Sequence, residues 1–118
     1  MSNETLDLSI ILEILEDKKA EQIRVYDVGD QLGIVGYFIF CSGNTDAHTR
    51  AIAGYCEQEL AKEGERLAYK EGVQSGRWIV LDYMDFVIHI FQPSVREYYR
   101  IDSIWQDRLV EVSAAPAT

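Results

Sequence analysis

The chain has 118 residues, 47% of them hydrophobic and 26% charged, a composition typical of one globular domain and not of a disordered protein. Its formal net charge of −9 argues against direct binding to nucleic acid, which needs clustered Lys and Arg, and is compatible with a basic protein partner. Without an apolar run of about 20 residues or a basic leader, the sequence predicts a cytoplasmic protein that does not enter a membrane.

The first predicted element is an amphipathic helix at about residues 4–19, with Asn3 as its N-cap and Glu4 at the positive end of the helix dipole. Its apolar positions recur at helical spacing: Leu8, Ile11, Leu12 and Leu15. A strand follows at about 22–28, where apolar residues alternate. The apolar run at about 34–41 has few polar positions, which is typical of a strand covered on both faces.

The next element is a helix that begins after the SGNTD turn, with either Asn44 or Thr45 as its cap. It continues to Lys62, and Gly64 is placed to end it. A short strand is predicted at about 66–71. Two cysteines, Cys41 and Cys56, lie in apolar patterns without metal-site spacing, and we interpret them as buried thiols in a reducing compartment.

The C-terminal third contains two strands in RWIVLDYMDFVIHIF, residues 77–91, and a final helix after Pro93. Ser94 and Glu97 have the spacing of a capping box at the start of this helix, and a break is predicted near Asp102. The last residues have nothing to bury, so we expect a mobile tail at 109–118 after a single domain at 1–108.

These elements predict an α/β (α+β-like) fold, in which helices pack on a mixed five-stranded sheet. The strand–helix–strand order around residues 34–71 suggests a parallel pair there, whereas the short connection at 82–85 requires an antiparallel hairpin.

A two-residue turn in this hairpin would pair Asp82 with Asp85 and Trp78 with His89. Because Tyr83 and Met84 are poor residues for a tight turn with positive φ, a longer or bulged connection remains open. One face of the hairpin is then purely apolar and should pack against helices: Ile79, Leu81, Phe86, Ile88 and Ile90. The other face is mixed, partly wet, and has the composition of a protein-binding surface: Trp78, Val80, Asp82, Asp85, Val87, His89 and Phe91. Alternatively, Trp78 tucks beneath the first helix or the tail.

Catalytic interpretations are weaker. A thiol–imidazole pair could be assembled from Cys41 with His48 or His89, but their spacing does not support it. The CSGNTD turn and the two aspartates suggest a metal-dependent nucleotidyltransferase, yet Asp82 and Asp85 are three residues apart and split by a turn. With no phosphate-binding loop and no HExxH motif, we expect no enzyme, no cofactor and no metal site.

Four blocks of the chain resemble the ribosomal silencing factor family, RsfS or Iojap, over about residues 6–107: KKAEQIRVYDV, YFIFCSGNTDAHTRAIAG, GRWIVLDYMDFVIHIF and REYY with IDSIW. The family motif GRW-h-h-h-D, where h is hydrophobic, matches residues 76–82, and the motif SGxxxxH matches Ser42, Gly43 and His48. Two departures stand out. Gly36 and Met84 occupy positions where many members carry Asp and Gly.

The resemblance implies a non-catalytic factor with a nucleotidyltransferase-like topology. It also implies binding to the fourteenth protein of the large ribosomal subunit, a basic protein on the intersubunit face, so that subunit joining is blocked when nutrients are short. A homodimer is compatible with it. We therefore predict a translation repressor, with a metal-dependent nucleotidyltransferase using Asp82 and Asp85, or a dimerisation module, as alternatives. The predicted partner-binding residues are Trp78, Val80, Asp82, Tyr83, Asp85, Val87, His89, Glu97 and Tyr98.

Overall fold

A mixed β-sheet forms the centre of the fold in the computed structural model, which describes residues 7–29 and 36–110. Within these ranges the strand order is β3-β4-β5-β2-β1-β6. The strands are β1 (Glu21–Asp27), β2 (Tyr37–Ser42), β3 (Tyr69–Glu71), β4 (Trp78–Asp82), β5 (Phe86–Phe91) and β6 (Leu109–Val110). Strands β2 and β5 pair in parallel, and the other neighbours are antiparallel.

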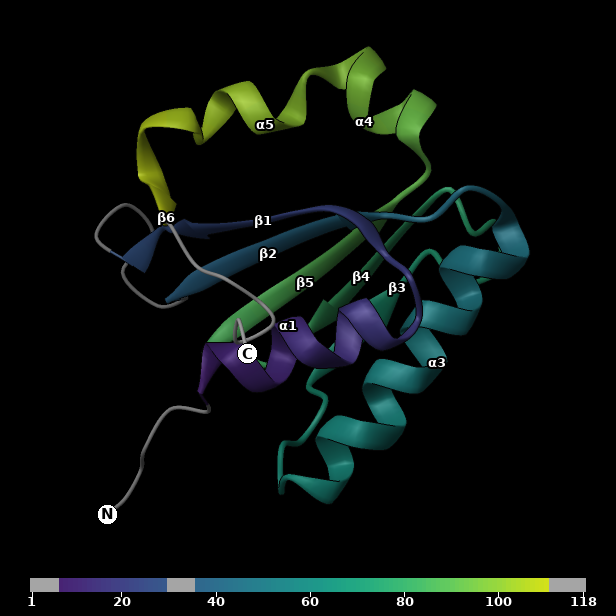
Figure 1. The fold of residues 1–118 in the computed structure, drawn as a ribbon, viewed down its shortest axis with the longest axis vertical. Coiled ribbons are helices and arrows are strands. Elements are labelled where there is room, and N and C mark those ends of the chain that lie inside the picture. Colours follow the sequence, from purple (N-terminus) through teal and green to yellow (C-terminus); the bar gives the residue numbers. More distant parts are fainter. Residues whose placement is uncertain (1–6, 30–35, 111–118) are drawn as a thin grey trace.

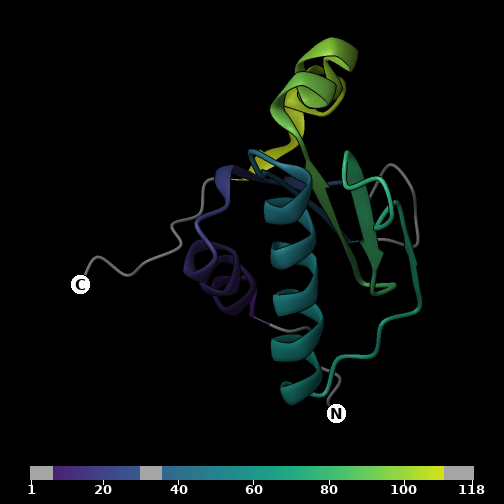
Figure 2. The same ribbon diagram turned by 90° about the vertical axis from the view of Figure 1, so that its right-hand side faces the viewer.

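Helices cover the sheet from both sides (Figure 1). Two longer helices, α1 (Leu8–Asp17) and α3 (Asp46–Lys62), lie beside each other on one face. On the opposite face lies the C-terminal segment, made of α4 (Pro93–Tyr99), α5 (Ile101–Ile104) and the 3-10 turn η1 (Gln106–Arg108). Figure 2 shows that α4 and α5 lie far from the C-terminal end of α3.

The larger core fills the space between the sheet and α1 and α3. It is built from the apolar stripes of the two helices and from one face of the strands, including Ile39, Ile79, Leu81, Ile88 and Ile90, all of which are fully buried. The prediction that this face of the hairpin packs against helices is therefore confirmed.

A second, smaller core lies under the C-terminal segment. Its buried residues are Tyr26, Val28, Phe40, Phe91 and Ile101, with Phe38, Val95 and Trp105 packed against them. Because β2 contributes to both cores, Ile39 through Ser42 are all buried, which confirms the prediction of a strand covered on both faces.

The first helix begins later than predicted, at Leu8, and it ends at Asp17 rather than at 19. Asp7 is the N-cap, since its Oδ1 accepts a hydrogen bond of 3.0 Å from the backbone N–H of Ser9. The predicted cap, Asn3, lies outside the described residues, as does Glu4. In α3, Thr45 is the N-cap, and Gly64 adopts φ +85° just beyond the helix, which confirms the predicted stop.

Three predictions about topology need correction. The sheet of the described residues has six strands, not five, because Leu109 and Val110 pair with Val25 and Tyr26 of β1. The tail predicted from 109 therefore contributes two residues to the sheet, and 111–118 lie outside the described residues. The parallel partner of β2 is β5, since β4 and β5 lie between β2 and β3.

The capping box predicted at Ser94 and Glu97 is also wrong. Helix α4 starts at Pro93, its N-cap is Gln92, and no side chain caps it. Proline suits the first helical position because its fixed φ is helical and its missing N–H would have no helical partner there. The predicted break lies at Arg100, two residues before Asp102, where φ is +50° and α4 gives way to α5.

Candidate functional site: the Trp78 groove

The hairpin of β4 and β5 closes through a wider connection than a two-residue turn. Trp78 lies opposite Phe91, and Asp82 lies opposite Val87, so the register is shifted by two residues from the tight-turn register. A shift of two leaves every side chain on its predicted face, because side chains alternate with a period of two. Asp85 therefore belongs to the connection and does not pair with Asp82.

The turn is held by short-range hydrogen bonds. The Oδ1 atom of Asp82 accepts the N–H of Met84 at 2.8 Å, and the N–H of Tyr83 donates to the carbonyl of Phe86 at 2.9 Å. Met84 itself has φ +77°, the left-handed region that favours glycine. The family departure at this position thus places a methionine where the backbone conformation suits glycine.

The second departure, Gly36, lies against the same turn. Its N–H donates to the carbonyl oxygen of Asp85 at 2.9 Å, and a Cβ at this position would lie 3.0 Å from that oxygen. A glycine therefore allows the start of β2 to approach the turn closely, without repositioning the hairpin.

The mixed face of the hairpin is drier than its sequence suggests. Phe91 is fully buried in the smaller core under the C-terminal segment, and Val87 is only 6% exposed. Tyr83 is buried too, but on the other side of the sheet, where it stacks on Phe86 in the larger core. Neither Val87 nor Tyr83 is accessible to a partner in this structure, which corrects their assignment as contact residues.

Trp78 lies at the edge of this face and remains 38% exposed. Its ring packs 5.0 Å from that of Phe91 and 6.4 Å from that of Tyr99 on α4. Together with α4 it borders a surface groove of about 600 Å³, which we call the Trp78 groove. The groove is lined by Ser75, Arg77, Trp78, Ser94, Val95, Tyr98 and Tyr99.

The backbone entering Trp78 is held against the start of α3. The hydroxyl of Thr49 donates to the carbonyl of Gly76 at 2.6 Å, and the guanidinium of Arg50 donates to the carbonyl of Gln74 at 3.0 Å. Gly72 and Gly76 both have positive φ, and a Cβ at Gly72 would lie 2.0 Å from the carbonyl oxygen of Trp78. The loop at residues 72–76 is therefore bonded to the first turn of α3. These contacts fix the position of the backbone that leads into Trp78.

The other seven predicted contact residues are distributed unevenly. Trp78 and Tyr98 meet in the groove, and Val80 and Asp82 continue the same face along β4. Asp85 is exposed in the turn. His89 is half-buried behind Trp78, and its Nδ1 lies 3.1 Å from Trp78 Nε1.

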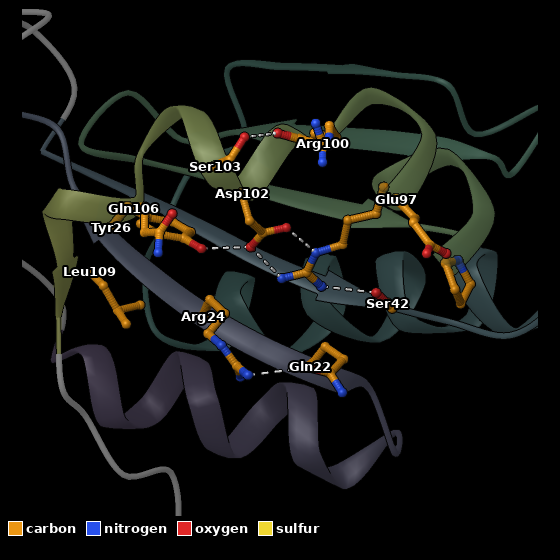
Figure 3. A pocket seen from close by; sticks show the side chains of 12 residues that line it. Gln22, Arg24, Tyr26, Ser42, Glu97, Arg100, Asp102, Ser103, Gln106 and Leu109 are labelled. Carbon is orange, nitrogen blue, oxygen red and sulfur yellow. Dashed lines mark hydrogen bonds and ion pairs between the residues drawn. The ribbon is translucent and has the colours of Figure 1, made fainter.

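Glu97 does not line the Trp78 groove. It faces a second, polar pocket of about 690 Å³ between β1 and the C-terminal segment (Figure 3). In this pocket Arg96 forms an ion pair with Asp102, with distances of 2.6 and 2.8 Å, and also donates to the hydroxyl of Ser42 at 2.9 Å. The hydroxyl of Tyr26 donates to Asp102 at 2.6 Å.

This network anchors α4 and α5 on the sheet. Burial alone would raise the pKa of Asp102, but the hydrogen bonds from Arg96 and Tyr26 outweigh it and lower that pKa below its ordinary value. Burial, reinforced by Asp102, raises the pKa of Tyr26. Tyr26 therefore stays protonated and donates to Asp102. Together with the Arg96–Asp102 ion pair, this bond holds α4, which borders the Trp78 groove, in place.

The side chains considered for catalysis are buried or engaged in structural hydrogen bonds. Asp82 caps the turn, and in the described ranges no three His, Cys, Asp or Glu side chains gather where they could share a metal ion. Cys41 and Cys56 are buried free thiols, as predicted, and burial raises the pKa of Cys41 to about 12. His48 takes part in structural hydrogen bonds: its Nδ1 accepts from Asn44 N–H at 3.1 Å, and its Nε2 lies 2.8 Å from the carbonyl of Lys18.

Sequence reasoning missed several groove residues, notably Tyr99, Val95 and Arg77. The Tyr98–Tyr99 pair was a usable signal, since two adjacent tyrosines cannot both be buried on one helix face. Both remain exposed, 78% and 59%, and their rings pack edge to face at 4.9 Å. Along the described chain, no helix is long and apolar enough to cross a membrane.

Comparison with known proteins identifies relatives along nearly the whole chain. The family model described as "Ribosomal silencing factor during starvation" matches residues 2–117. The chain is 32% identical over 107 residues to ribosomal silencing factor RsfS of Halalkalibacterium halodurans, covering 91% of each protein. It is 31% identical to the protein of the same name from Bacillus subtilis, covering 89% of each.

Solved structures show the same fold. A crystal structure of a protein from Bacillus halodurans superposes with a TM-score of 0.79 at 28% identity, covering 89% of this chain and 96% of the other. A crystal structure of a protein from Chromobacterium violaceum superposes with a TM-score of 0.78 at 30% identity, covering 94% of this chain and 90% of the other. A mouse protein named "Mitochondrial assembly of ribosomal large subunit protein 1" is 25% identical over 92% of this chain and 51% of its own length.

Proposed function

Because this chain belongs to the ribosomal silencing factor family, we propose that it represses translation by binding the large ribosomal subunit. In this proposal it contacts the basic protein numbered fourteenth in that subunit, on the intersubunit face, and sterically keeps the small subunit from joining. The repression acts in the cytoplasm when nutrients are short, and it involves no catalysis and no cofactor.

The observation that carries the proposal is the cluster of exposed aromatic rings at the Trp78 groove. Trp78, Tyr98 and Tyr99 are 38%, 78% and 59% exposed, although large aromatic side chains lose favourable burial when they face water. Aromatic residues around a depression are typical of protein-binding hot spots, where a partner side chain enters and water is excluded.

Charge supports a basic partner. The chain carries a formal net charge of −9, and Asp82 and Asp85 lie at the end of the hairpin away from Trp78. Opposite charge on a partner would speed encounter and fix orientation, while the aromatic groove would supply most of the affinity. The name of the mouse relative points to the large subunit as the source of the partner.

The test is co-sedimentation with purified large subunits on sucrose gradients. We expect Trp78→Ala and Asp82→Lys each to weaken binding by at least about thirtyfold, because each removes or reverses a contact at the centre or the acidic end of the surface. Circular dichroism should show that both variants remain folded, since Trp78 is partly exposed and Asp82 is half-exposed.

Matched controls lie elsewhere on the molecule. Tyr55→Ala removes a partly exposed aromatic ring from α3, and Glu13→Lys makes the same charge reversal on α1, and both helices lie on the opposite side of the sheet. Both controls should bind like the wild type. Undiminished binding of Trp78→Ala and Asp82→Lys would rule out the proposed binding site. Loss of binding in the controls would show that the effect of the substitutions is not specific to this site.

Blocking of subunit joining is a separate measurement. Purified large and small subunits are mixed with and without the protein, and the joined ribosome peak is followed on a gradient. We expect the peak to fall with wild-type protein and to persist with Trp78→Ala. A protein that binds the large subunit without reducing the joined peak would contradict steric repression and leave the binding site intact.

We propose that the nucleotidyltransferase-like topology expected of the family serves here as a scaffold. Asp82 already accepts the N–H of Met84, and Asp85 lies outside the strand, so the two carboxylates are not presented as a ligand pair on one strand edge. Mg²⁺ with a nucleoside triphosphate should leave the melting temperature unchanged, whereas a clear rise would favour the enzyme.

The Trp78 groove could also pair with a second copy of this chain. If a homodimer uses this surface, dimerisation and ribosome binding compete, and Trp78→Ala should weaken both. Sedimentation velocity over a concentration series measures the first, and a dimer that persists in Trp78→Ala would place its interface elsewhere.

A further inference from the structure

The single polar atom of the Trp78 side chain has a hydrogen-bond partner within the protein. Its Nε1–H donates to Nδ1 of His89 at 3.1 Å, along a diagonal of the β4–β5 pair, because Trp78 lies opposite Phe91 and His89 lies two residues before it. The indole of an exposed Trp ordinarily keeps its N–H for water or for a partner. Here the N–H is already bonded to His89, so a partner would meet the carbon atoms of the ring.

His89 can accept this hydrogen bond only as a neutral imidazole with its proton on Nε2. Its ring is enclosed by aromatic groups, with the ring centroids of Phe38 and Phe40 at 4.9 and 5.1 Å and that of Phe91 at 6.0 Å. Burial lowers the pKa of His89 to about 4, although Asp82 acts in the opposite direction. The acceptor is therefore retained at neutral pH.

The position is a costly one for histidine. The Nε2 atom is buried and has no hydrogen-bond partner within the described part of the chain. A phenylalanine would fill the same aromatic surroundings without burying an unpaired N–H, and burying such a group lowers stability. The single feature that histidine adds is the acceptor for Trp78, and residues that sacrifice stability are concentrated at functional sites.

We infer that His89 is a positioning residue: it does not contact the partner but holds the indole of Trp78 in the orientation that presents its ring to the Trp78 groove. This rests on the proposed function, in which Trp78 anchors the partner. It assigns His89 a role different from the direct contact predicted from sequence, and it predicts that the partner meets Trp78 through apolar or ring-face contacts rather than through the indole N–H.

The test compares two substitutions with opposite defects. His89→Phe keeps an aromatic ring and removes the acceptor, whereas His89→Asn loses the ring but can place its amide oxygen where Nδ1 lies. We expect His89→Phe to melt at or above the wild-type temperature and to bind large subunits about five- to tenfold more weakly, the effect of one lost hydrogen bond. His89→Asn should melt at a lower temperature and bind nearly as well as the wild type at a temperature where both are folded.

A spectroscopic measurement reports on the indole without the ribosome. The chain has two tryptophans, so Trp105→Phe leaves Trp78 as the only one. In this background, His89→Phe should increase acrylamide quenching of Trp78 fluorescence and lower its steady-state anisotropy, because the ring is no longer tethered. His89→Asn should restore most of the wild-type signal.

The outcomes distinguish the positioning role of His89 from the proposed function. If the wild type binds, Trp78→Ala does not, and His89→Phe binds normally with unchanged quenching, the inference is overturned and the proposed function stands. If binding follows melting temperature across the variants, His89 has only a structural role, which also overturns the inference. If the wild type fails to bind large subunits, the proposed function fails, and with it the docking role of His89.

Discussion

Met84 shows the cost of a single residue in an unfavourable backbone conformation. Its φ of +77° lies in the left-handed region, where a side chain costs about 1 kcal/mol or more relative to glycine. Its side chain is 63% exposed, so little packing offsets this cost. We expect Met84→Gly to raise the free energy of unfolding by about 0.5–1 kcal/mol, measured by urea denaturation, and to leave ribosome binding unchanged.

Gly64 provides the matched control for that prediction. It also has a positive φ, and a Cβ placed there would meet nothing within 4 Å. Gly64→Ala should therefore lower stability by about 1 kcal/mol through backbone conformation alone. If Met84→Gly is destabilising while Gly64→Ala behaves as expected, the exposed Met84 side chain contributes packing that outweighs its strain.

His89 makes stability depend on pH. Its pKa is lowered to about 4 in the folded protein and returns to about 6.5 on unfolding, so the unfolded chain takes up the proton first as pH falls. The wild type should lose about 2 kcal/mol between pH 7.5 and pH 5 relative to His89→Phe, which lacks the titrating group. Urea unfolding of both proteins at the two pH values measures this difference, and parallel pH dependence would contradict it.

At the scale of elements, the position of α4 depends on a partly buried ion pair, Arg96 with Asp102. Arg96 is 8% exposed, and its guanidinium is satisfied by Asp102 and Ser42. Asp102→Ala would leave this charge without its partner and remove the acceptor of Tyr26. We expect a loss of about 2–3 kcal/mol in the free energy of unfolding and weaker ribosome binding, since α4 forms one wall of the Trp78 groove.

The exposed ion pair of Lys70 with Glu57 is the control for that loss. Its side chains are 46% and 29% exposed at a distance of 3.0 Å, so Lys70→Ala should change stability by less than about 1 kcal/mol.

Because Asp102 has a lowered pKa, its contribution to stability is present at neutral pH and is lost as pH falls below the ordinary carboxyl range. A small effect of Asp102→Ala would show that apolar packing alone holds the C-terminal segment.

At the scale of the whole molecule, net charge governs the approach to the ribosome. The chain, with its formal charge of −9, attracts a basic partner through long-range electrostatics. Added salt screens this attraction and shortens the distance over which it acts. Between ionic strengths of 0.05 and 0.3 M, we expect the association rate constant to fall about tenfold while the dissociation rate constant changes little. Trp78→Ala should instead raise the dissociation rate constant, and stopped-flow or surface-based kinetics distinguish the two.

Much of the fold follows from local patterns. The helix that ends before Gly64, the doubly covered strand β2 and the apolar face of the hairpin were all predicted correctly, because spacing of apolar residues reflects burial directly. The faces of the hairpin survived an error in register, since a shift of two residues preserves alternation. Boundaries were less accurate: Asp7, not Asn3, caps α1, and a two-residue strand such as β6 has no periodic signal.

The sequence by itself determined the family, the apolar positions and Trp78 as the central residue of the candidate site. The tertiary structure alone decided which other residues join it. Tyr83 is buried on the opposite side, Glu97 faces the polar pocket and Tyr99 lines the groove, because these positions depend on how α4 crosses the sheet. That crossing is set by contacts between residues far apart in the chain, such as Arg96 with Ser42 and Tyr26 with Asp102, which no local pattern records.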